Sequence, residues 1–398
     1  MAIKGGQILH VAGDAAGTGF IVDRIQTGGI TGINVNEEKI EELGNYQTVG
    51  TVRDIPDLTF EIESFDVTTE MESVITGGDN MEAGGTEFDL ATAVPLDILS
   101  PYKDSTGVFT VTYGSVVIPT LYLESVSYSM SLTESMSTTW GLRGDSVFYV
   151  PGSAYRETDD GDGIQTVFNF ANTALGSAIG GDTYYGLAVY VDGEKQRLGT
   201  DYTNTATGVT FTTAPPVGTD NVVFIYGSAT AATYNQSVHN TTDPAGVRGR
   251  DIQIQLGDGM ASYTDWFGVQ SVNIDWRVTL ERDEEFNNPL VVAQDFDTPE
   301  VTGSVTMKPT DVPALFSQIQ AIAGLGATAI ANATQDPPEL EFRCVIKDSS
   351  GTTTKTLQVA DAKWTMPSLQ GNVGAKLETD FAFTSSSGDL NIFKGDQP

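Results

Sequence analysis

Cysteine, histidine and positive charge are all scarce in this sequence of 398 residues. Cys344 is the single cysteine, so neither an internal disulfide nor a thiolate zinc cluster can form. His10 and His239 are the two histidines, and they lie far apart in the chain. Imidazole is the commonest transition-metal ligand and general base, so we expect neither a histidine-based metal centre nor a catalytic triad.

The charge balance is strongly acidic. The chain has 20 Lys and Arg against 53 Asp and Glu, a formal net charge of -33. A protein that binds nucleic acid by neutralising phosphates is therefore not expected. The charge does not exclude a sheath past which DNA slides. With 39% hydrophobic residues, 18 Phe and 14 Tyr, the composition is that of a folded protein rather than a disordered one, and its length suits two or three domains.

Long apolar runs are missing as well. No stretch approaches the roughly 20 apolar residues of a membrane span. The segment that follows Met1–Gly6 lacks the apolar core of a secretory signal peptide. We therefore expect that the protein makes no contact with a membrane and is synthesised in a cytoplasm.

Short alternating runs of apolar and polar residues dominate what is present. This period of two predicts half-buried strands at 58–63, 108–113, 126–132 and 377–383. Two helices are expected, at 66–75 behind an N-cap Asp66 and at 311–319 with Pro313 in its first turn. The sequence thus predicts a mainly β protein in which each of two β-barrel or sandwich domains carries one flanking helix.

An internal repeat supports two related domains. Residues 39–59 align without a gap to residues 282–302 with seven identities in 21 positions. Upstream, Gly13-Asp14 aligns with Gly257-Asp258. Downstream, Thr120-Leu121 and Met130 align with Thr356-Leu357 and Met366. Matches that keep the same order in both halves of the chain are what a duplicated domain predicts.

Between the repeats lies a segment with no counterpart elsewhere in the chain. We expect it to be a small Ig-like β-sandwich with strands at 166–170, 187–191, 209–212 and 221–226. Asp192-Gly193 is typical of a hairpin turn. The acidic stretch 159–163 lacks the spacing of a calcium loop, so it is interpreted as a solvated linker. The predicted domains are residues 1–149, 150–232 and 233–398.

The sequence contains no recognised motif for catalysis or for cofactor binding. The pairs Glu41-Glu42 and Glu284-Glu285 occur at equivalent places in both repeats, which favours a repeated surface loop over an active site. Gly13–Gly19 is glycine-rich but is followed by no Lys-Ser or Lys-Thr that would hold phosphates. We therefore expect a protein that is not an enzyme, has no cofactor or metal, and works through shape and assembly.

Several motifs together resemble the tail tube proteins of long-tailed bacteriophages. They are the opening basic residue, Gly, Ile and Gly-Asp, the run from Asp54 through Pro56 to Thr59, the helix opening Asp66-Val67, and the late strand 121–130. The likeness covers both repeats. The intervening segment is similar to a small β domain of phage structural and fibre proteins.

This resemblance implies six tube domains per ring, with rings stacked into a hollow virion tail. Because the chain carries two copies, three chains would complete a pseudo-sixfold ring, with the inserted sandwich projecting outward. The family's inter-ring loop corresponds to residues 36–51 and 279–294, which makes these residues contact candidates: Glu41, Glu42, Asn45, Glu284, Glu285 and Asn288. The implied partners are further copies of the chain, the tape measure protein, and the tail terminator or distal tail proteins.

The acidity then has a mechanical interpretation. A lumen lined with Asp and Glu repels phosphates, so genomic DNA passes without specific binding during ejection. A non-contractile tail is favoured over a contractile one. The main alternative is a receptor-binding or adhesin-type fibre protein, in which Tyr184, Tyr185, Tyr190 and Tyr202 stack on sugars. A capsid decoration protein and a carboxylate-based glycosidase are further alternatives.

Overall fold

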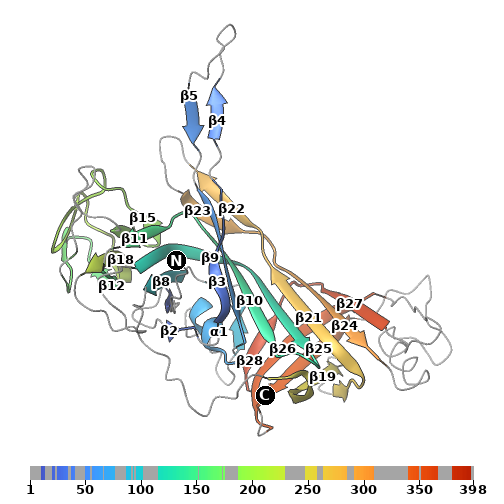
Figure 1. Ribbon diagram of the computed structural model, residues 1–398. Coiled ribbons are helices and arrows are strands. Elements are labelled where there is room, and N and C mark those ends of the chain that lie inside the picture. The colour runs from blue at the N-terminus through green and yellow to red at the C-terminus, as the bar shows by residue number, and fades with distance from the viewer. Residues whose placement is uncertain are drawn as a thin grey trace, which may run out of the picture.

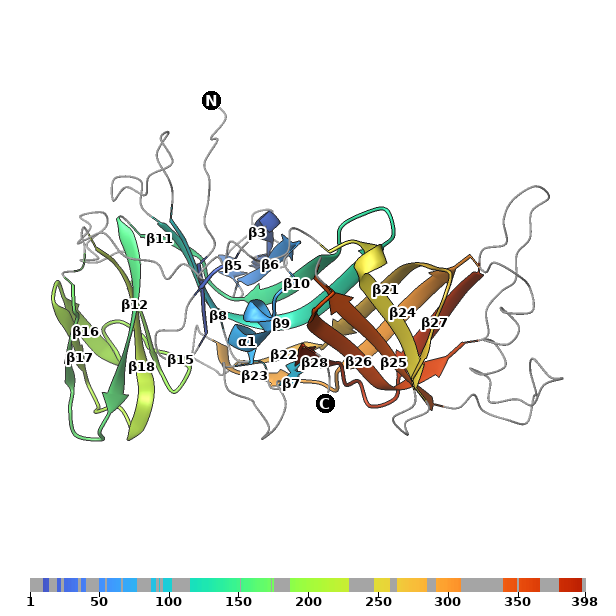
Figure 2. The same cartoon turned by 90° about the horizontal axis from the view of Figure 1, so that it is seen from below.

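The computed structural model is mainly β, as the sequence predicts, and its sheets are antiparallel. Figure 2 shows three bodies in a row, with a small sandwich at one end, the first repeat in the middle and the second repeat at the other end. The structure describes residues 10–13, 20–22, 25–34, 37–40, 50–53, 56–65, 67–76, 87–90, 93, 96–101, 115–150, 152–172, 174, 187–228, 247–257, 263–284, 291–308, 339–348, 351–365 and 379–395.

The first repeat is a run of seven antiparallel strands. Their spatial order is β2, β1, β8, β9, β10, β6 and β3. A short strand, β11, pairs with β9 beside the run, and the hairpin β4–β5 extends from it (Figure 1). The bounds are β1 (His10–Gly13), β2 (Phe20–Ile21), β3 (Ile25–Asn34), β4 (Glu37–Ile40), β5 (Gly50–Arg53), β6 (Asp57–Ser64), β7 (Glu87–Asp89), β8 (Leu96–Pro101), β9 (Ser115–Ser131), β10 (Ser137–Gly144) and β11 (Phe148–Val150).

The second repeat has the same topology. Its order is β20, β19, β25, β26, β27, β24 and β21, and β28 pairs with β26 as β11 pairs with β9. The bounds are η2 (Gly249–Asp251), β19 (Ile252–Gly257), β20 (Tyr263–Asp265), β21 (Val269–Arg277), β22 (Leu280–Glu284), β23 (Val291–Phe296), β24 (Glu300–Met307), β25 (Glu339–Lys347), β26 (Thr353–Trp364), β27 (Thr379–Ser385) and β28 (Asn391–Lys394). The front and back of the chain thus share one strand arrangement.

The sequence alignment of the late strands is wrong in register. His10 lies opposite Leu99, and its aligned counterpart Ile254 lies opposite Cys344. Leu99 pairs with Val117, whereas Cys344 pairs with Leu357. Leu357 therefore corresponds to Val117 and not to Leu121. Period-two alternation repeats every two residues, so it fits several registers equally well.

Strand β9 joins the two repeats. Its N-terminal half pairs with β8 and β11, while its C-terminal half lies between β10 and β21. The chain bends between the halves at Thr120, whose φ of 52° is unusual for a β-branched residue. The Thr120 N–H donates to Asp97 Oδ1 at 2.9 Å, which holds the bend.

The helix of the first repeat is shorter than predicted. Helix α1 (Glu70–Ile75) begins after Thr69, four residues later than the expected opening, and Asp66 lies outside the described residues. Met71 and Ile75 are buried, as the predicted apolar side of the helix requires. The second expected helix, 311–319, and the expected strand 108–113 also lie outside the described residues.

The inserted segment forms two small sheets around its own apolar core. One sheet contains β12 (Ser153–Gly161), β18 (Gly218–Ser228), β14 (Ala188–Val191) and β15 (Glu194–Lys195), and the other contains β13 (Val167–Asn169), β17 (Gly208–Phe211) and β16 (Tyr202–Thr205). Asp192 and Gly193 both have positive φ at the β14–β15 turn, as the predicted hairpin requires. Residues that fill the core include Phe168, Phe211, Phe224 and Tyr226.

The larger sheet of the insert is covered on both faces. Val223 and Ile225 of β18 pack with Leu99 and Val117 of the first repeat, on the face opposite the insert's own core. At this contact Arg156 Nε lies 2.7 Å from Asp97 Oδ2, and both side chains are about nine-tenths buried. The small sandwich is therefore fixed against the first repeat.

The acidic stretch 159–163 is not a linker. Asp159 to Gly161 are the end of strand β12, paired with β18. Asp160 Oδ1 accepts the N–H of Asp220, and Asp162 Oδ1 accepts the N–H of Ile164. The carboxylates satisfy backbone donors of the turn, a local structure that net acidity does not reveal.

A buried ion pair ties the two repeats together. Lys355 Nζ of β26 lies 2.5 Å from Glu72 Oε1 of α1, and neither side chain is exposed to solvent. The Tyr128 hydroxyl of β9 donates to the same carboxylate oxygen at 2.8 Å. Burial, and then the charge of Glu72, raise the pKa of Tyr128 well above its usual value, so this hydroxyl remains a donor.

Lys355→Met should destabilise the protein by about 3–5 kcal/mol, because Glu72 would keep a buried charge without its cation. Adding Glu72→Gln removes that charge and retains an acceptor for Tyr128, so the double variant should recover most of the loss. Urea unfolding followed by tryptophan fluorescence measures both. A double variant that is as unstable as the single one would contradict this account.

Candidate assembly surface

One face of the sheet that spans both repeats is open and polar. It runs across β3, β6, β10, β9, β21, β24 and β27, whose opposite face carries the core residues such as Phe60, Trp140, Ile274 and Phe383. We call it the polar face. Its side chains are mostly Ser, Thr and Asn: Thr27, Thr31, Thr59, Ser125, Ser127, Ser129, Ser131, Ser137, Thr139, Ser271, Asn273, Thr302, Ser304, Thr306 and Thr384.

The charged residues of the polar face are mainly acidic. Arg143 and Arg277 are its cations, and each pairs with a carboxylate at an end of the face, Asp57 and Glu300 respectively. The remaining carboxylates are Glu61, Glu63, Asp275 and Asp380. The face is therefore net negative.

Hydroxyl groups hold most of these remaining carboxylates. Ser127 donates to Asp275 at 2.5 Å, and Thr306 donates to Asp380 at 2.7 Å. Thr27 donates to Glu63 at 3.2 Å. Small hydroxyl side chains thus outnumber carboxylates on this face.

Of the six predicted inter-ring residues, the structure describes one. Glu284 is the last residue of β22 and pairs with Val291. Glu41, Glu42, Asn45, Glu285 and Asn288 lie outside the described residues. In Figure 1 the equivalent hairpin β4–β5 points away from the sheet. The role of these six residues remains a prediction.

An arginine that the sequence did not single out connects the second hairpin to the first repeat. Arg282 of β22 donates from Nη2 to Asp57 Oδ1 at 3.1 Å and to the Gly144 carbonyl at 2.6 Å. Arg143 also donates to Asp57, at 2.7 and 2.9 Å. The hydrogen bond from Arg143, followed by the charges of Arg143 and Arg282, lowers the pKa of Asp57 despite partial burial.

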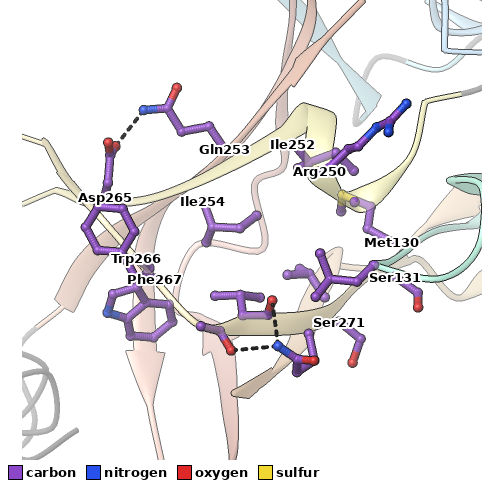
Figure 3. Close-up of a pocket in the computed structure, with 16 residues that line it drawn as sticks. Met130, Ser131, Arg250, Ile252, Gln253, Ile254, Asp265, Trp266, Phe267 and Ser271 are labelled. Carbon is purple, nitrogen blue, oxygen red and sulfur yellow. Dashed lines mark hydrogen bonds between the residues drawn. The ribbon is translucent and has the colours of Figure 1, made fainter. Parts of the chain in front are cut away.

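A crevice of about 310 Å³ lies where the repeats meet (Figure 3). Met130 and Leu132 line it from the first repeat, and Ile254, Trp266 and Phe267 line it from the second. Phe267 is 75% exposed at its rim. The lining combines these apolar side chains with polar ones such as Arg250, Gln253 and Asp265.

The tyrosines considered for sugar binding are poorly placed for it. Tyr190 and Tyr202 are 4% and 3% exposed, within the packing of the insert. Tyr184 and Tyr185 lie outside the described residues. Stacking on a sugar requires an exposed ring, so neither Tyr190 nor Tyr202 serves the adhesin alternative.

Among the described residues, no three His, Cys, Asp or Glu side chains gather in a way that could hold a metal ion. None of the helices in this described part is long and apolar enough to cross a bilayer. Cys344 is buried, and burial raises the pKa of its thiol far above the usual value.

Comparisons with known proteins give little further information. No family model matches the sequence, and no curated protein matches it. A solved structure described as the anti-feeding prophage (AFP) baseplate, determined by cryo-electron microscopy with sixfold symmetry, contains a chain that is similar over 35% of this protein and 91% of its own length. The sequence identity is 7% and the TM-score 0.26. A likeness of this size defines neither a family nor a function.

Asp57→Asn should lower the free energy of unfolding by about 1–3 kcal/mol at neutral pH, because Arg143 and Arg282 lose a charged acceptor. The folded-state pKa of Asp57 is depressed, so its contribution is present above the unfolded value of about 3.9 and is lost as the pH falls through the folded pKa. Denaturant unfolding at pH 7 and pH 3 measures this. A difference between variant and wild type that is equal at both pH values would contradict the assignment.

Proposed function

We propose that the protein is a structural virion protein that assembles into stacked rings and forms the hollow tail tube of a bacteriophage. Each ring contains three chains and therefore six tube domains in pseudo-sixfold order. The observation that carries the proposal is the polar face, a single surface that continues without interruption from the first repeat into the second. It provides the wall of the lumen.

The chemistry of the polar face suits passage of DNA. Tight binding of DNA requires cations that displace counterions from phosphates. Here Arg143 and Arg277 are already paired with carboxylates, and the net charge of the face is negative. Short hydroxyl side chains offer no large apolar surface on which bases could stack. DNA therefore passes without specific binding.

The duplicated topology supports the ring of three. The two repeats have the same strand order, and β9 and β21 already join them into one sheet. Each chain thus supplies two consecutive sectors of a ring. The small sandwich packs on the first repeat through β8 and β9, and on this proposal it lies on the outside of the tube.

The proposed role as a tail tube also implies where the protein is found and what its partners are. The protein is made in the host cytoplasm and resides in the virion tail. Its partners are other copies of itself, the tape measure protein, and the tail terminator or distal tail proteins. The tail is non-contractile, and the protein acts without an enzymatic activity or a cofactor.

Negative-stain electron microscopy of the purified protein tests the assembly. Hollow tubes or stacked rings with three chains per ring are expected. Discrete knobs or monomers of 42.3 kDa at all concentrations would overturn the proposal.

A cysteine-labelling experiment tests which face lines the lumen. Cys344 is fully buried, so one introduced cysteine is the single reactive thiol. Ser304→Cys on the polar face should react with a small maleimide in tubes and in dissociated protein. A polyethylene-glycol maleimide of about 5 kDa should label it at least tenfold more slowly in tubes, because the reagent fills a narrow bore.

Glu194→Cys is the matched control, because Glu194 is exposed on the small sandwich. It should react with both reagents at similar rates in tubes and in dissociated protein. Equal labelling of Ser304→Cys and Glu194→Cys by the bulky reagent in tubes would show that the polar face is outside.

A further inference from the structure

The crevice where the repeats meet has walls that are held in place by backbone hydrogen bonds. The Leu132 N–H at the end of β9 donates to the Gln270 carbonyl of β21 at 3.0 Å. On the other wall, the Trp266 N–H donates to the Ile254 carbonyl of β19 at 2.8 Å. Because β9, β19 and β21 fix the walls, the crevice of about 310 Å³ is formed before any ligand enters it.

A glycine brings the third wall close to β9. A Cβ atom on Gly249 of η2 would lie 2.6 Å from the Ser131 carbonyl oxygen and 2.7 Å from the Leu132 Cα atom, so a larger residue would push the two backbones apart. Arg250 is the next residue and lines the crevice. The close approach of η2 therefore sets where this cation lies.

The crevice has an apolar floor and an apolar rim. Met130, Ile254 and Trp266 form the floor, and each is 3–6% exposed. Leu132 and Phe267 line the same crevice and are 42% and 75% exposed. Their apolar surface is in contact with water in the single chain, so an apolar group that covered it would be stabilised by the hydrophobic effect.

Two opposite charges lie on opposite sides of the crevice (Figure 3). On one side, Asp265 Oδ1 already accepts hydrogen bonds from Gln253 Nε2 at 2.6 Å and Gln255 Nε2 at 3.0 Å. On the other side, Arg250 Nε is 3.6 Å from Asp251 Oδ1, which is beyond hydrogen-bond distance, and 76% of the Arg250 side chain is exposed. The guanidinium thus has donors to offer to an anion.

We propose that this crevice binds a small organic acid, with its apolar group against Trp266, Phe267 and Leu132 and its carboxylate on Arg250. The volume is at the lower end of the range of small-molecule pockets, about 300–1,000 Å³, so it suits a group of one ring. Arg donates two parallel hydrogen bonds to a carboxylate. The reverse orientation is disfavoured, because it would place the acid beside the Asp265 carboxylate.

The site goes beyond the proposed function, since a tube does not require a small ligand. Both repeats contribute to the crevice, so a bound acid contacts β9 of the first repeat and β19 and β21 of the second. A ligand that binds the folded chain alone stabilises it by mass action. The acid would therefore strengthen the junction between the repeats.

Three probes with the same apolar group and different head groups test the proposal: 4-phenylbutyrate, 4-phenylbutanol and 4-phenylbutylamine. Ligand-observed NMR titration of the full chain measures their affinities. The acid should bind with a Kd on the order of 1 mM, as expected for so small a molecule. The alcohol and the amine should bind at least about fivefold more weakly. Equal affinities, a tighter amine, or no binding of the acid would overturn the proposal.

Two substitutions test the two parts of the site separately. Arg250→Gln should reduce the affinity of the acid to that of the alcohol and leave the alcohol unchanged. Phe267→Ala should weaken the acid and the alcohol alike, by at least about threefold, because both lose the same apolar contact. Both side chains are exposed, so the circular-dichroism spectrum and melting temperature should not change. Wild-type affinity for the acid in both variants would place the probe elsewhere and overturn the proposal.

Matched controls make the same kinds of change away from the crevice. Arg277→Gln removes a 68% exposed cation from the opposite end of β21, and Ile164→Ala shortens an 84% exposed apolar side chain on the small sandwich. Both variants should bind the acid like the wild type. A loss of affinity in either control as large as in the site variants would show a nonspecific effect and overturn the proposal.

A peptide probe distinguishes a small acid from the end of another protein chain. Acetyl-Gly-Gly-Phe with a free carboxylate presents the same ring and charge on a peptide, and it should bind no more tightly than 4-phenylbutyrate. Binding at least about tenfold tighter would overturn the assignment to a small acid, because the additional backbone would then contribute to recognition. None of these results affects the tube proposal, which electron microscopy tests independently.

Discussion

Backbone pairing along β9 is the constraint on which the rest of the structure depends. A strand of 17 residues presents donors and acceptors on both edges, and nearly all of these must be paired when buried. Four strands provide the partners, with β8 and β11 on one half and β10 and β21 on the other. The bend at Thr120 lets one strand serve two sheets, and the second half joins the repeats.

This constraint also shapes the surface. Because β21 lies directly beside β9, the serines at 127 and 129 face Asp275 and Asn273 across the junction. Hydrogen bonds between Ser127, Asp275 and Asn273 continue the polar pattern over the boundary between repeats. On the other side of the same strands, Tyr128 and Trp276 belong to one core. One pairing therefore makes both the core and the face continuous.

Much of the fold could be predicted from period-two alternation, but β3 could not. β6, β27 and the C-terminal part of β9 have regular alternation, and each forms near its predicted place. β3 contains three glycines and two register shifts against β6, so its alternation is broken. The aligned stretches 39–59 and 282–302 reach from the β4–β5 hairpin into β6 and from the β22–β23 hairpin into β24, but they do not include β3 or β21.

The long-range polar contacts also could not be predicted from the sequence. Glu72 and Lys355 are 283 residues apart, and nothing near either residue indicates that the other neutralises it. The same holds for Arg282 and Asp57, although the alignment places Arg282 opposite a lysine in the first repeat. The hydroxyl-rich character of the polar face could have been recognised from the serines of β9 once the register was known.

The way in which the small sandwich closes on itself affects how the chain can fold. Ser153 at its start pairs with Ser228 at its end, so the two ends of the insert lie next to each other. Once the insert has folded, the flexible chain between β9 and β21 is shortened by about the whole length of the insert. The entropic cost of bringing these two strands together falls accordingly. An insert with adjacent ends can also be gained or lost during evolution without displacing the strands on either side.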